Sequence, residues 1–188
     1  MRDYKISELM VPLSEYATVS QDATLLDAVM ELERAQEEFE DRHTRYRHRA
    51  ILVLDDDGFV IGKLSQLDVL RALEPKYEEM LDGRGSHKLG FTKQFMTSML
   101  EDYHLFDSPL EDICRKTMDH KVTKFMYQLT EGEFVSIDAS LAEAIHLIII
   151  GHHQSLLVKR GERIEGILRQ TDVFAAVFHM MKECKPDF

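Results

Sequence analysis

A serine and an aspartate three residues apart, Ser65 and Asp68, are the residues of this chain best suited to hold a polar ligand. A strand that ends at Ser65 and a helix that begins near Leu67 would leave unpaired backbone N–H groups at the helix N-terminus, which suits a phosphate. The Ser65 hydroxyl could bind the same phosphate oxygens, and the ionised Asp68 carboxylate could accept two O–H donors from a ribose diol. The same spacing is also an N-capping pattern, so a purely structural role stays open.

The motif occurs a second time, with an arginine in place of the serine. Residues 62–69 read Gly-Lys-Leu-Ser-Gln-Leu-Asp-Val, and residues 166–173 read Gly-Ile-Leu-Arg-Gln-Thr-Asp-Val. With Arg169 in place of a serine, the hydroxyl that could cap the helix is absent and a fixed positive charge is present. The guanidinium could bind a phosphate bidentately, or the bulk of the side chain could fill the site. Asp172 lies one helical turn further and could pair with Arg169 instead of with a ligand. We favour this pair, and therefore a single ligand per chain.

The two motifs belong to a duplication that covers both ends of the chain. Residues 5–10 and 19–28 return at 121–126 and 135–144, both at an offset of 116, whereas the motif returns at an offset of 104. The first copy therefore carries 12 more residues than the second. A tandem duplication predicts two similar folding units related by a pseudo-twofold axis.

Each copy predicts the same element order, β-α-β-β-α. In the first copy an extended piece at 17–20 leads to a helix that begins at the capping pattern Thr24-x-x-Asp27. A β-hairpin over 51–64 then enters a second helix at Asp68. The second copy repeats the series with the extended piece at 133–136, the cap Ser140-x-x-Glu143, the hairpin over 156–168 and the second helix at Asp172.

The expected boundaries leave a long segment between the copies. We expect a first repeat at 1–73 with its insertion at about 33–48, a helical linker at 74–120 and a second repeat at 121–188. The linker carries aromatic and Met residues, which favours packing over disorder. The insertion lengthens the first helix and ends in an arginine-rich run at 42–49. We interpret most of this run as a solvated helix end that pairs with the acidic residues before it, with Arg49 as the exception because it adjoins a strand.

The motif Gly-x-hydrophobic-Ser-x-x-Asp-Val, together with Val-Ser-x-Asp-Ala-x-Leu-x-x-Ala upstream, resembles the regulatory domain known from cystathionine β-synthase, the CBS domain. Such domains occur as tandem pairs, called Bateman modules. The resemblance implies an α/β (α+β) fold in which two β-α-β-β-α repeats pack as a pseudo-twofold pair. It also implies clefts for adenine nucleotides (AMP, ADP or ATP) or S-adenosylmethionine, and frequent assembly into homodimers.

The resemblance also implies which residues would bind the ligand. The candidates are Thr18, Arg49, Ala50, Ile51, Ser65, Asp68, Arg169 and Asp172. We therefore expect a regulatory module with no catalytic residues and no obligatory cofactor, which binds a nucleotide and signals its occupancy to an unidentified protein. The alternative is a ligand-free interaction and dimerisation scaffold whose clefts are filled by side chains such as Arg169. Exposed apolar residues on the last helix of each copy, among them Leu70 and Phe178, favour a homodimer in either case.

Composition and charge argue against several other classes. The net charge of −11 disfavours nucleic acid or an anionic membrane as a partner. The longest strongly apolar stretch, 147–150, is far too short to cross a bilayer. The two cysteines, Cys114 and Cys184, lack CxxC spacing and suggest reduced thiols in a cytoplasmic protein. No catalytic motif is present, and we interpret the adjacent histidines at 152–153 as an exposed pair, not as metal ligands.

Overall fold

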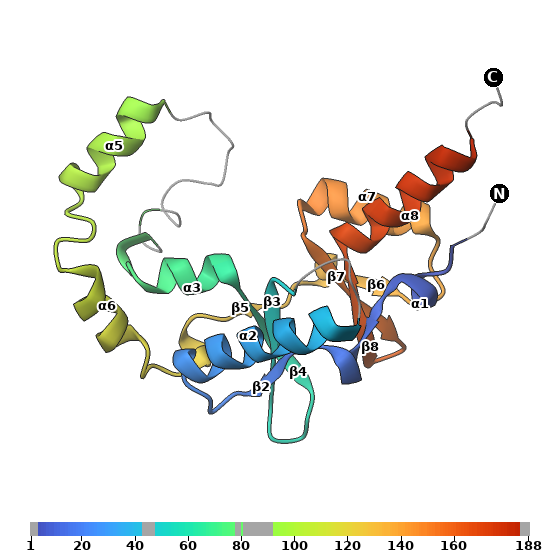
Figure 1. Cartoon of the computed structure of the whole chain (residues 1–188), viewed down its shortest axis with the longest axis horizontal. Coiled ribbons are helices and arrows are strands. Elements are labelled where there is room, and N and C mark those ends of the chain that lie inside the picture. Colours follow the sequence, from blue (N-terminus) through green and yellow to red (C-terminus); the bar gives the residue numbers. More distant parts are fainter. Residues whose placement is uncertain (1–3, 43–47, 78–79, 81–91, 185–188) are drawn as a thin grey trace. The chain divides into compact units, whose positions relative to one another are not determined.

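A computed structural model describes residues 4–42, 48–77, 80 and 92–184 and divides the chain into two compact units (Figure 1). One unit combines Met1–Ala17 and Ala35–His48 with Gln128–Phe188, and the other combines Thr18–Arg34 with Arg49–Tyr127. Each unit therefore contains segments from both copies of the duplication. Residues 43–47 of the predicted arginine-rich run lie outside the described residues.

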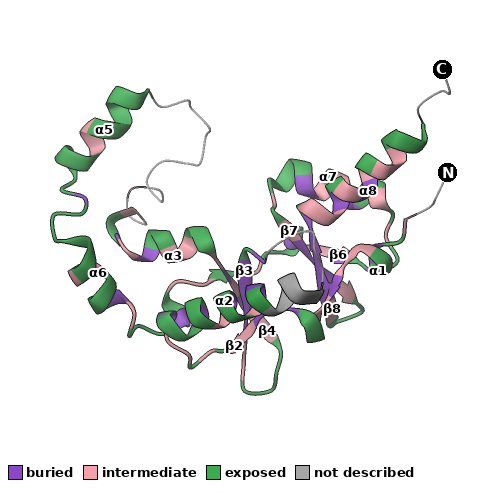
Figure 2. Ribbon diagram, viewed as in Figure 1, coloured by how far each residue is buried: buried purple, intermediate pink, exposed green. Residues whose placement is uncertain are grey.

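The unit that carries Ser65 and Asp68 is built on a four-stranded sheet in the order β2-β3-β4-β5. Strand β2 (Thr18–Ser20) runs parallel to β3 (Ala50–Leu54), and β3 forms an antiparallel hairpin with β4 (Val60–Ser65). Helix α3 (Gln66–Ala72) follows β4 directly and begins two residues before the Asp68 that we expected as its start. Figure 2 shows buried residues along β3, where Leu52 and Val53 are completely enclosed.

The same unit contains the described part of the segment between the copies. The start of the second copy adds the short 3₁₀ turn η2 (Val122–Lys124) and strand β5 (Tyr127–Gln128) to this unit, and the segment itself forms α5 (Lys93–Asp102) and α6 (Leu110–Thr117). Its end docks on the start of α2 (Leu25–Arg42), because the backbone N–H of Leu25 donates to the His120 carbonyl at 2.8 Å. At this start the predicted cap forms, since the Thr24 hydroxyl accepts from the Asp27 N–H at 3.1 Å.

The unit that carries Arg169 and Asp172 has its own four-stranded sheet, in the order β1-β8-β7-β6. Strand β6 (Phe134–Ser136) is parallel to β7 (Ser155–Arg160), which forms a hairpin with β8 (Arg163–Arg169). The helices of this unit and its short turns are α1 (Ile6–Leu9), η1 (Leu13–Glu15), η3 (Glu131–Glu133), α7 (Leu141–Gly151) and α8 (Gln170–Glu183). Like α3, helix α8 begins two residues before the aspartate that we expected as its start. The core of this unit contains apolar side chains from helices and strands, including Ile6, Val135, Ala144, Ile148, Leu156, Val158, Leu168 and Val173.

The two sheets exchange their outermost strands. Strand β1 (Val11–Pro12), from the first copy, pairs with β8 of the second copy, and β5, from the start of the second copy, lies beside β4 of the first. A β-carbon on Gly166 would lie 2.3 Å from the Val11 carbonyl oxygen, so this glycine is required for the close approach of β1. The predicted element order missed both strands, because a two-residue strand carries no detectable alternation of apolar and polar residues.

The strand register locates the extra residues of the first copy. Thr18 pairs with Leu52 in one sheet, and Phe134 pairs with Leu157 in the other. The offset in residue number between equivalent positions of the two copies is therefore 116 at the first strand of each pair and 105 at the second. Leu54 pairs with Val60, and Lys159 pairs with Ile164, so it falls to 104 within the hairpin turn. Eleven extra residues therefore precede β3 and one lies in the turn. In keeping with this, α2 has 18 residues and α7 has 11.

Candidate functional site

The first motif forms a complete N-terminal cap on α3. The Ser65 hydroxyl accepts from the Asp68 N–H at 3.2 Å and donates to Asp68 Oδ2 at 2.5 Å. The Ser65 backbone N–H donates to the same carboxylate oxygen at 2.8 Å. The capping interpretation of this motif is therefore confirmed. Because the hydroxyl proton already points at Asp68, Ser65 could donate to a phosphate only by breaking that hydrogen bond.

The N-terminus of α3 offers fewer N–H groups than we expected. The Gln66 N–H donates to the Arg49 carbonyl at 3.0 Å, and the Asp68 N–H is taken by Ser65. Two of the N–H groups that we expected to be unpaired at this helix start are therefore satisfied, one by the residue before β3 and one by the cap. Phosphate binding by the helix terminus alone therefore has little support.

One carboxylate oxygen of Asp68 takes no part in the cap. Asp68 Oδ1 lies 3.5 Å from a guanidinium nitrogen of Arg71, one turn further along α3. The Arg71 side chain is 45% exposed, so the contact is a long surface ion pair that contributes little to stability. Oδ1 can therefore accept hydroxyl donors at the cost of a weak interaction.

The sheet brings the other candidates of the first copy to the same end of the unit. Ala50 pairs with Ser65 across β3 and β4, Ile51 pairs with Leu64, and Thr18 pairs with Leu52 on the neighbouring strand. Ala50 and Ile51 are buried, so they can form a wall of a site but offer no polar side chain. Arg49 is exposed and lies immediately before β3.

The second motif is closed by an ion pair. Arg169 Nε lies 2.7 Å from Asp172 Oδ2, and its Nη2 lies 2.7 Å from Asp172 Oδ1. The two side chains are only 10% and 13% exposed. The predicted pairing of Arg169 with Asp172 is confirmed, and both carboxylate oxygens are used by the same guanidinium.

Two aromatic rings that the sequence reasoning missed are buried beside this ion pair. Tyr16 and His48 are both buried, and their ring centroids lie 4.5 Å apart in an edge-to-face arrangement. Burial raises the pKa of the Tyr16 phenol well above its ordinary value, although the charge of Arg169 opposes this shift. Burial, and to a smaller extent the charge of Arg169, lower the pKa of His48 from 6.5 to about 4. The only signal in the sequence is that Gly132 stands at the position equivalent to Tyr16.

Other candidate chemistry is not assembled in the described parts of the chain. Among those residues, no group of three His, Cys, Asp or Glu side chains could hold a metal ion. His152 adopts the left-handed conformation (φ 53°) that ends α7. Cys114 and Cys184 are exposed and are not joined by a disulfide. Within the described residues, no helix combines the length and apolar character needed to cross a membrane.

Comparison with known proteins agrees with this architecture. A family model described as CBS domain matches residues 6–75 and 130–179, which together exceed half of the chain. The chain therefore belongs to the CBS-domain family, and the predicted tandem fold is confirmed. No curated protein matches the sequence significantly.

Solved structures give the same result for the fold. The CBS-pair protein CBSX2 from Arabidopsis thaliana is 17% identical, with a TM-score of 0.59 over 96% of this chain and 99% of that one. A putative acetoin utilization protein from Vibrio cholerae is 15% identical, with a TM-score of 0.57 over 98% and 100% of the two chains. A CBSX2 structure in complex with AMP is 17% identical, with a TM-score of 0.55 over 95% and 98%.

Proposed function

We propose that this chain is a non-catalytic regulatory module of the cytoplasm that binds one adenine nucleotide or adenosyl ligand through its first motif. The observation that carries the proposal is the difference between the two aspartates. Asp68 keeps Oδ1 outside its cap, where its contact within the described residues is a long one to Arg71, whereas both oxygens of Asp172 are bound to Arg169. A ribose diol needs a carboxylate oxygen that can accept hydroxyl donors, and the first motif supplies one.

The surrounding residues suit the rest of such a ligand. Thr18 on the neighbouring strand adds a hydroxyl, and the start of β3 at Ala50 and Ile51, whose side chains are buried, can contact a base along its backbone. The exposed guanidinium of Arg49 is the cation of this end of the sheet that can reach a phosphate. AMP is the first ligand to test, because it is the molecule bound in the CBSX2 complex.

Signalling would follow from differential affinity. A ligand can shift the conformation of the module, or of a complex with a regulated protein, only by the difference between its binding free energies to the two states. We also propose a homodimer, since the exposed face of α8 carries Phe174, Phe178 and Met181. Light scattering at micromolar concentration should then exceed the 21.9 kDa of one chain. A particle of that mass alone would rule out the dimer.

Calorimetric titration with AMP, ATP and S-adenosylmethionine tests the nucleotide site. Asp68→Ala should weaken binding by roughly ten- to hundredfold, since hydrogen bonds to a charged group contribute about 1–3 kcal/mol. Asp27→Ala is the matched control. Asp27 caps α2 through the same contacts, accepting from the Thr24 N–H at 2.9 Å and from its hydroxyl at 2.7 Å, so this variant loses a cap without losing the site.

A ligand-free scaffold is the second candidate function, and the complete cap at Ser65 favours it. If none of the three ligands raises the melting temperature of the folded chain, Asp68 is a capping residue only. Equal nucleotide affinity in the Asp68→Ala and Asp27→Ala proteins would lead to the same conclusion.

A further inference from the structure

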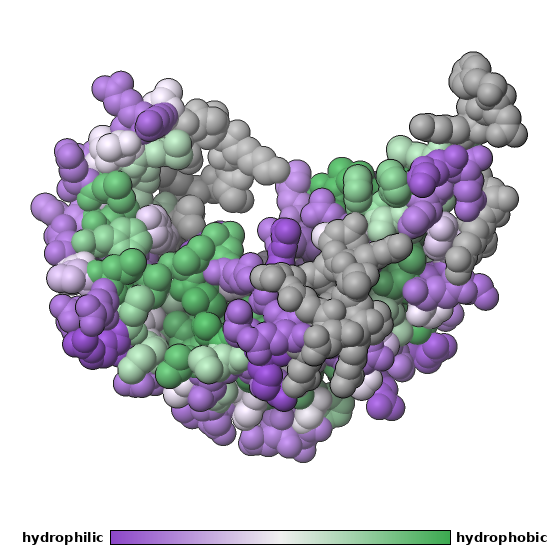
Figure 3. Space-filling view, viewed as in Figure 1, coloured by the Kyte–Doolittle hydropathy of each residue, from purple (hydrophilic) through white to green (hydrophobic). Residues whose placement is uncertain are grey.

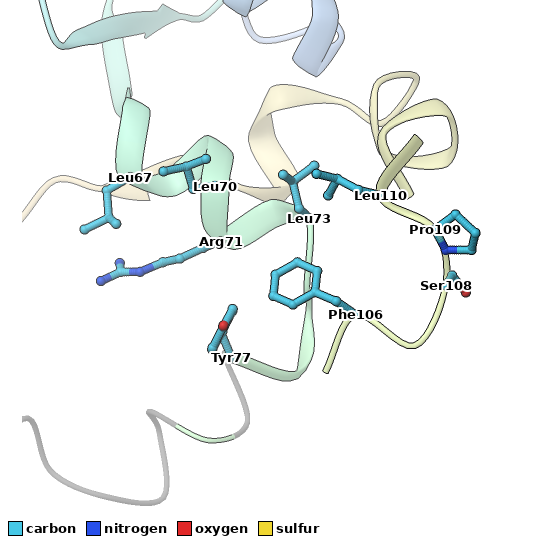
Figure 4. A pocket seen from close by; sticks show the side chains of 9 residues that line it. All are labelled: Leu67, Leu70, Arg71, Leu73, Tyr77, Phe106, Ser108, Pro109 and Leu110. Carbon is cyan, nitrogen blue, oxygen red and sulfur yellow. The ribbon is translucent and has the colours of Figure 1, made fainter. Parts of the chain in front are cut away.

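A concave surface lies on α3, on the side of Leu67, Leu70 and Arg71. It is an apolar pocket of about 830 Å³ between these residues and the segment that runs into α6, where Phe106 and Leu110 face it. Figure 3 shows an apolar area in this part of the molecule, and Figure 4 shows the lining side chains at close range. The volume is typical of sites for small organic molecules.

The wall of the pocket opposite α3, formed by the segment around Phe106, is held in place by buried and charged groups. The Glu74 carboxylate is buried and accepts from the Phe106 N–H at 2.8 Å. Lys76 Nζ donates to the His104 carbonyl at 2.6 Å. The rings of Tyr77 and Phe106 meet edge to face with centroids 6.1 Å apart. Charge-assisted hydrogen bonds of this kind are the stronger class, so the wall is a built feature of the unit.

Arg71 is the charged residue among the described residues that line the pocket. Among the described residues its guanidinium contacts Asp68 Oδ1 at 3.5 Å, so a better-aligned carboxylate can replace that contact with two short hydrogen bonds. Leu70 is 60% exposed on the same surface, which leaves apolar area for a tail to cover. A cation beside an apolar hollow is complementary to an anion with an apolar tail.

We propose that this pocket binds a free monocarboxylate with an alkyl tail of medium length. The tail lies between Leu70, Phe106 and Leu110, and the carboxylate binds Arg71. The pocket is also coupled to the first motif, a part of the proposal that rests on the proposed nucleotide function. When the ligand takes Arg71, Asp68 Oδ1 is released to accept ribose hydroxyls, so each ligand favours binding of the other.

Calorimetry of the full chain with decanoate tests the pocket. One decanoate should bind per chain, and Leu70→Asp should abolish binding by placing a charge in the tail site. Leu26→Asp is the matched control, because Leu26 is 44% exposed on α2 and does not line the pocket. Arg71→Gln should weaken decanoate about tenfold, as expected for the loss of a charge-assisted hydrogen bond, and should leave decanol unchanged.

The coupling has its own readout. Saturating decanoate should tighten AMP binding about threefold or more, and Arg71→Gln should remove this effect. Decanoate binding without any AMP binding would defeat the nucleotide function and leave the pocket standing. The pocket proposal is wrong if folded wild-type protein binds no decanoate, or if Leu70→Asp binds it as well as wild type. A wild-type dimer that excludes decanoate and dissociates on Leu70→Asp would show that a second copy fills the pocket.

Discussion

The two copies of the motif differ in which groups bind the carboxylate of their aspartate. In the first, a small hydroxyl caps the helix and the aspartate keeps one oxygen beyond the cap. In the second, an arginine replaces the hydroxyl and binds both aspartate oxygens in a nearly buried ion pair. The difference between Ser65 and Arg169 therefore leaves one aspartate oxygen outside the cap in the first motif and occupies both aspartate oxygens in the second.

The difference also has a structural consequence. In the first motif the cation, Arg71, lies on the surface, where water screens its ion pair with Asp68. In the second motif the cation, Arg169, is buried beside Tyr16 and His48, where an unpaired charge would be poorly solvated. We infer that the second motif contributes to stability and the first to binding.

Breaking each ion pair should give the largest contrast. Arg169→Met leaves Asp172 nearly buried without its partner and should lower the free energy of unfolding by about 3 kcal/mol. Arg71→Met removes an exposed cation at the same spacing and leaves Asp68 in its cap with Ser65, so it should change this free energy by less than about 0.5 kcal/mol. Urea denaturation of both variants measures the two losses. Equal losses would contradict the assignment of a structural role to the second motif alone.

The motif glycines should give the next largest contrast. An alanine β-carbon at Gly166 would meet the Val11 carbonyl oxygen at 2.3 Å, so strand β1 must move. At Gly62 the nearest atom is the Met126 sulfur at 2.4 Å, at the flexible part of a side chain that can turn away. We expect Gly166→Ala to destabilise by about 2–3 kcal/mol and Gly62→Ala by about 1 kcal/mol. The reverse order in thermal unfolding would show that β5 tolerates displacement less well than β1.

Substitutions in the second motif should show which side chains prevent it from binding a nucleotide. Wild type should bind one nucleotide per chain. Arg169→Ser recreates the Ser-x-x-Asp pattern, but we expect the stoichiometry to stay at one while Tyr16 and His48 remain buried beside it. Adding Tyr16→Gly, the residue of the equivalent position in the other copy, should raise the stoichiometry to two. Two sites in the Arg169→Ser protein alone would mean that the guanidinium is the whole obstacle.

The sequence revealed the parts of this comparison that depend on local spacing. The Ser65–Asp68 cap and the Arg169–Asp172 pair each join residues one helical turn apart, and both could be predicted from residue types alone. The repeat also predicted the two hairpins, because in both copies two apolar runs flank a polar turn that contains a glycine. The neighbours of the second motif could not be predicted this way. Tyr16 and His48 lie beside Arg169 through tertiary contacts between residues far apart in sequence, which local spacing does not reveal.

The smallest expected effect is the pH dependence that His48 gives to the second motif. Its pKa is about 4 in the folded chain, against an ordinary value of 6.5, so below pH 6.5 the unfolded chain binds a proton that the folded chain does not. The stability that His48 contributes is therefore complete above pH 6.5 and is lost as the pH falls toward 4.

Between pH 7.5 and 5.5 this loss should amount to about 1 kcal/mol of unfolding free energy. His48→Phe keeps an aromatic ring beside Tyr16 and removes the titrating group, so its stability should fall less over the same range. Parallel urea titrations of both proteins at the two pH values measure the difference. Identical pH profiles would place His48 in contact with water, and the second motif would then be less enclosed than the burial of Arg169 indicates.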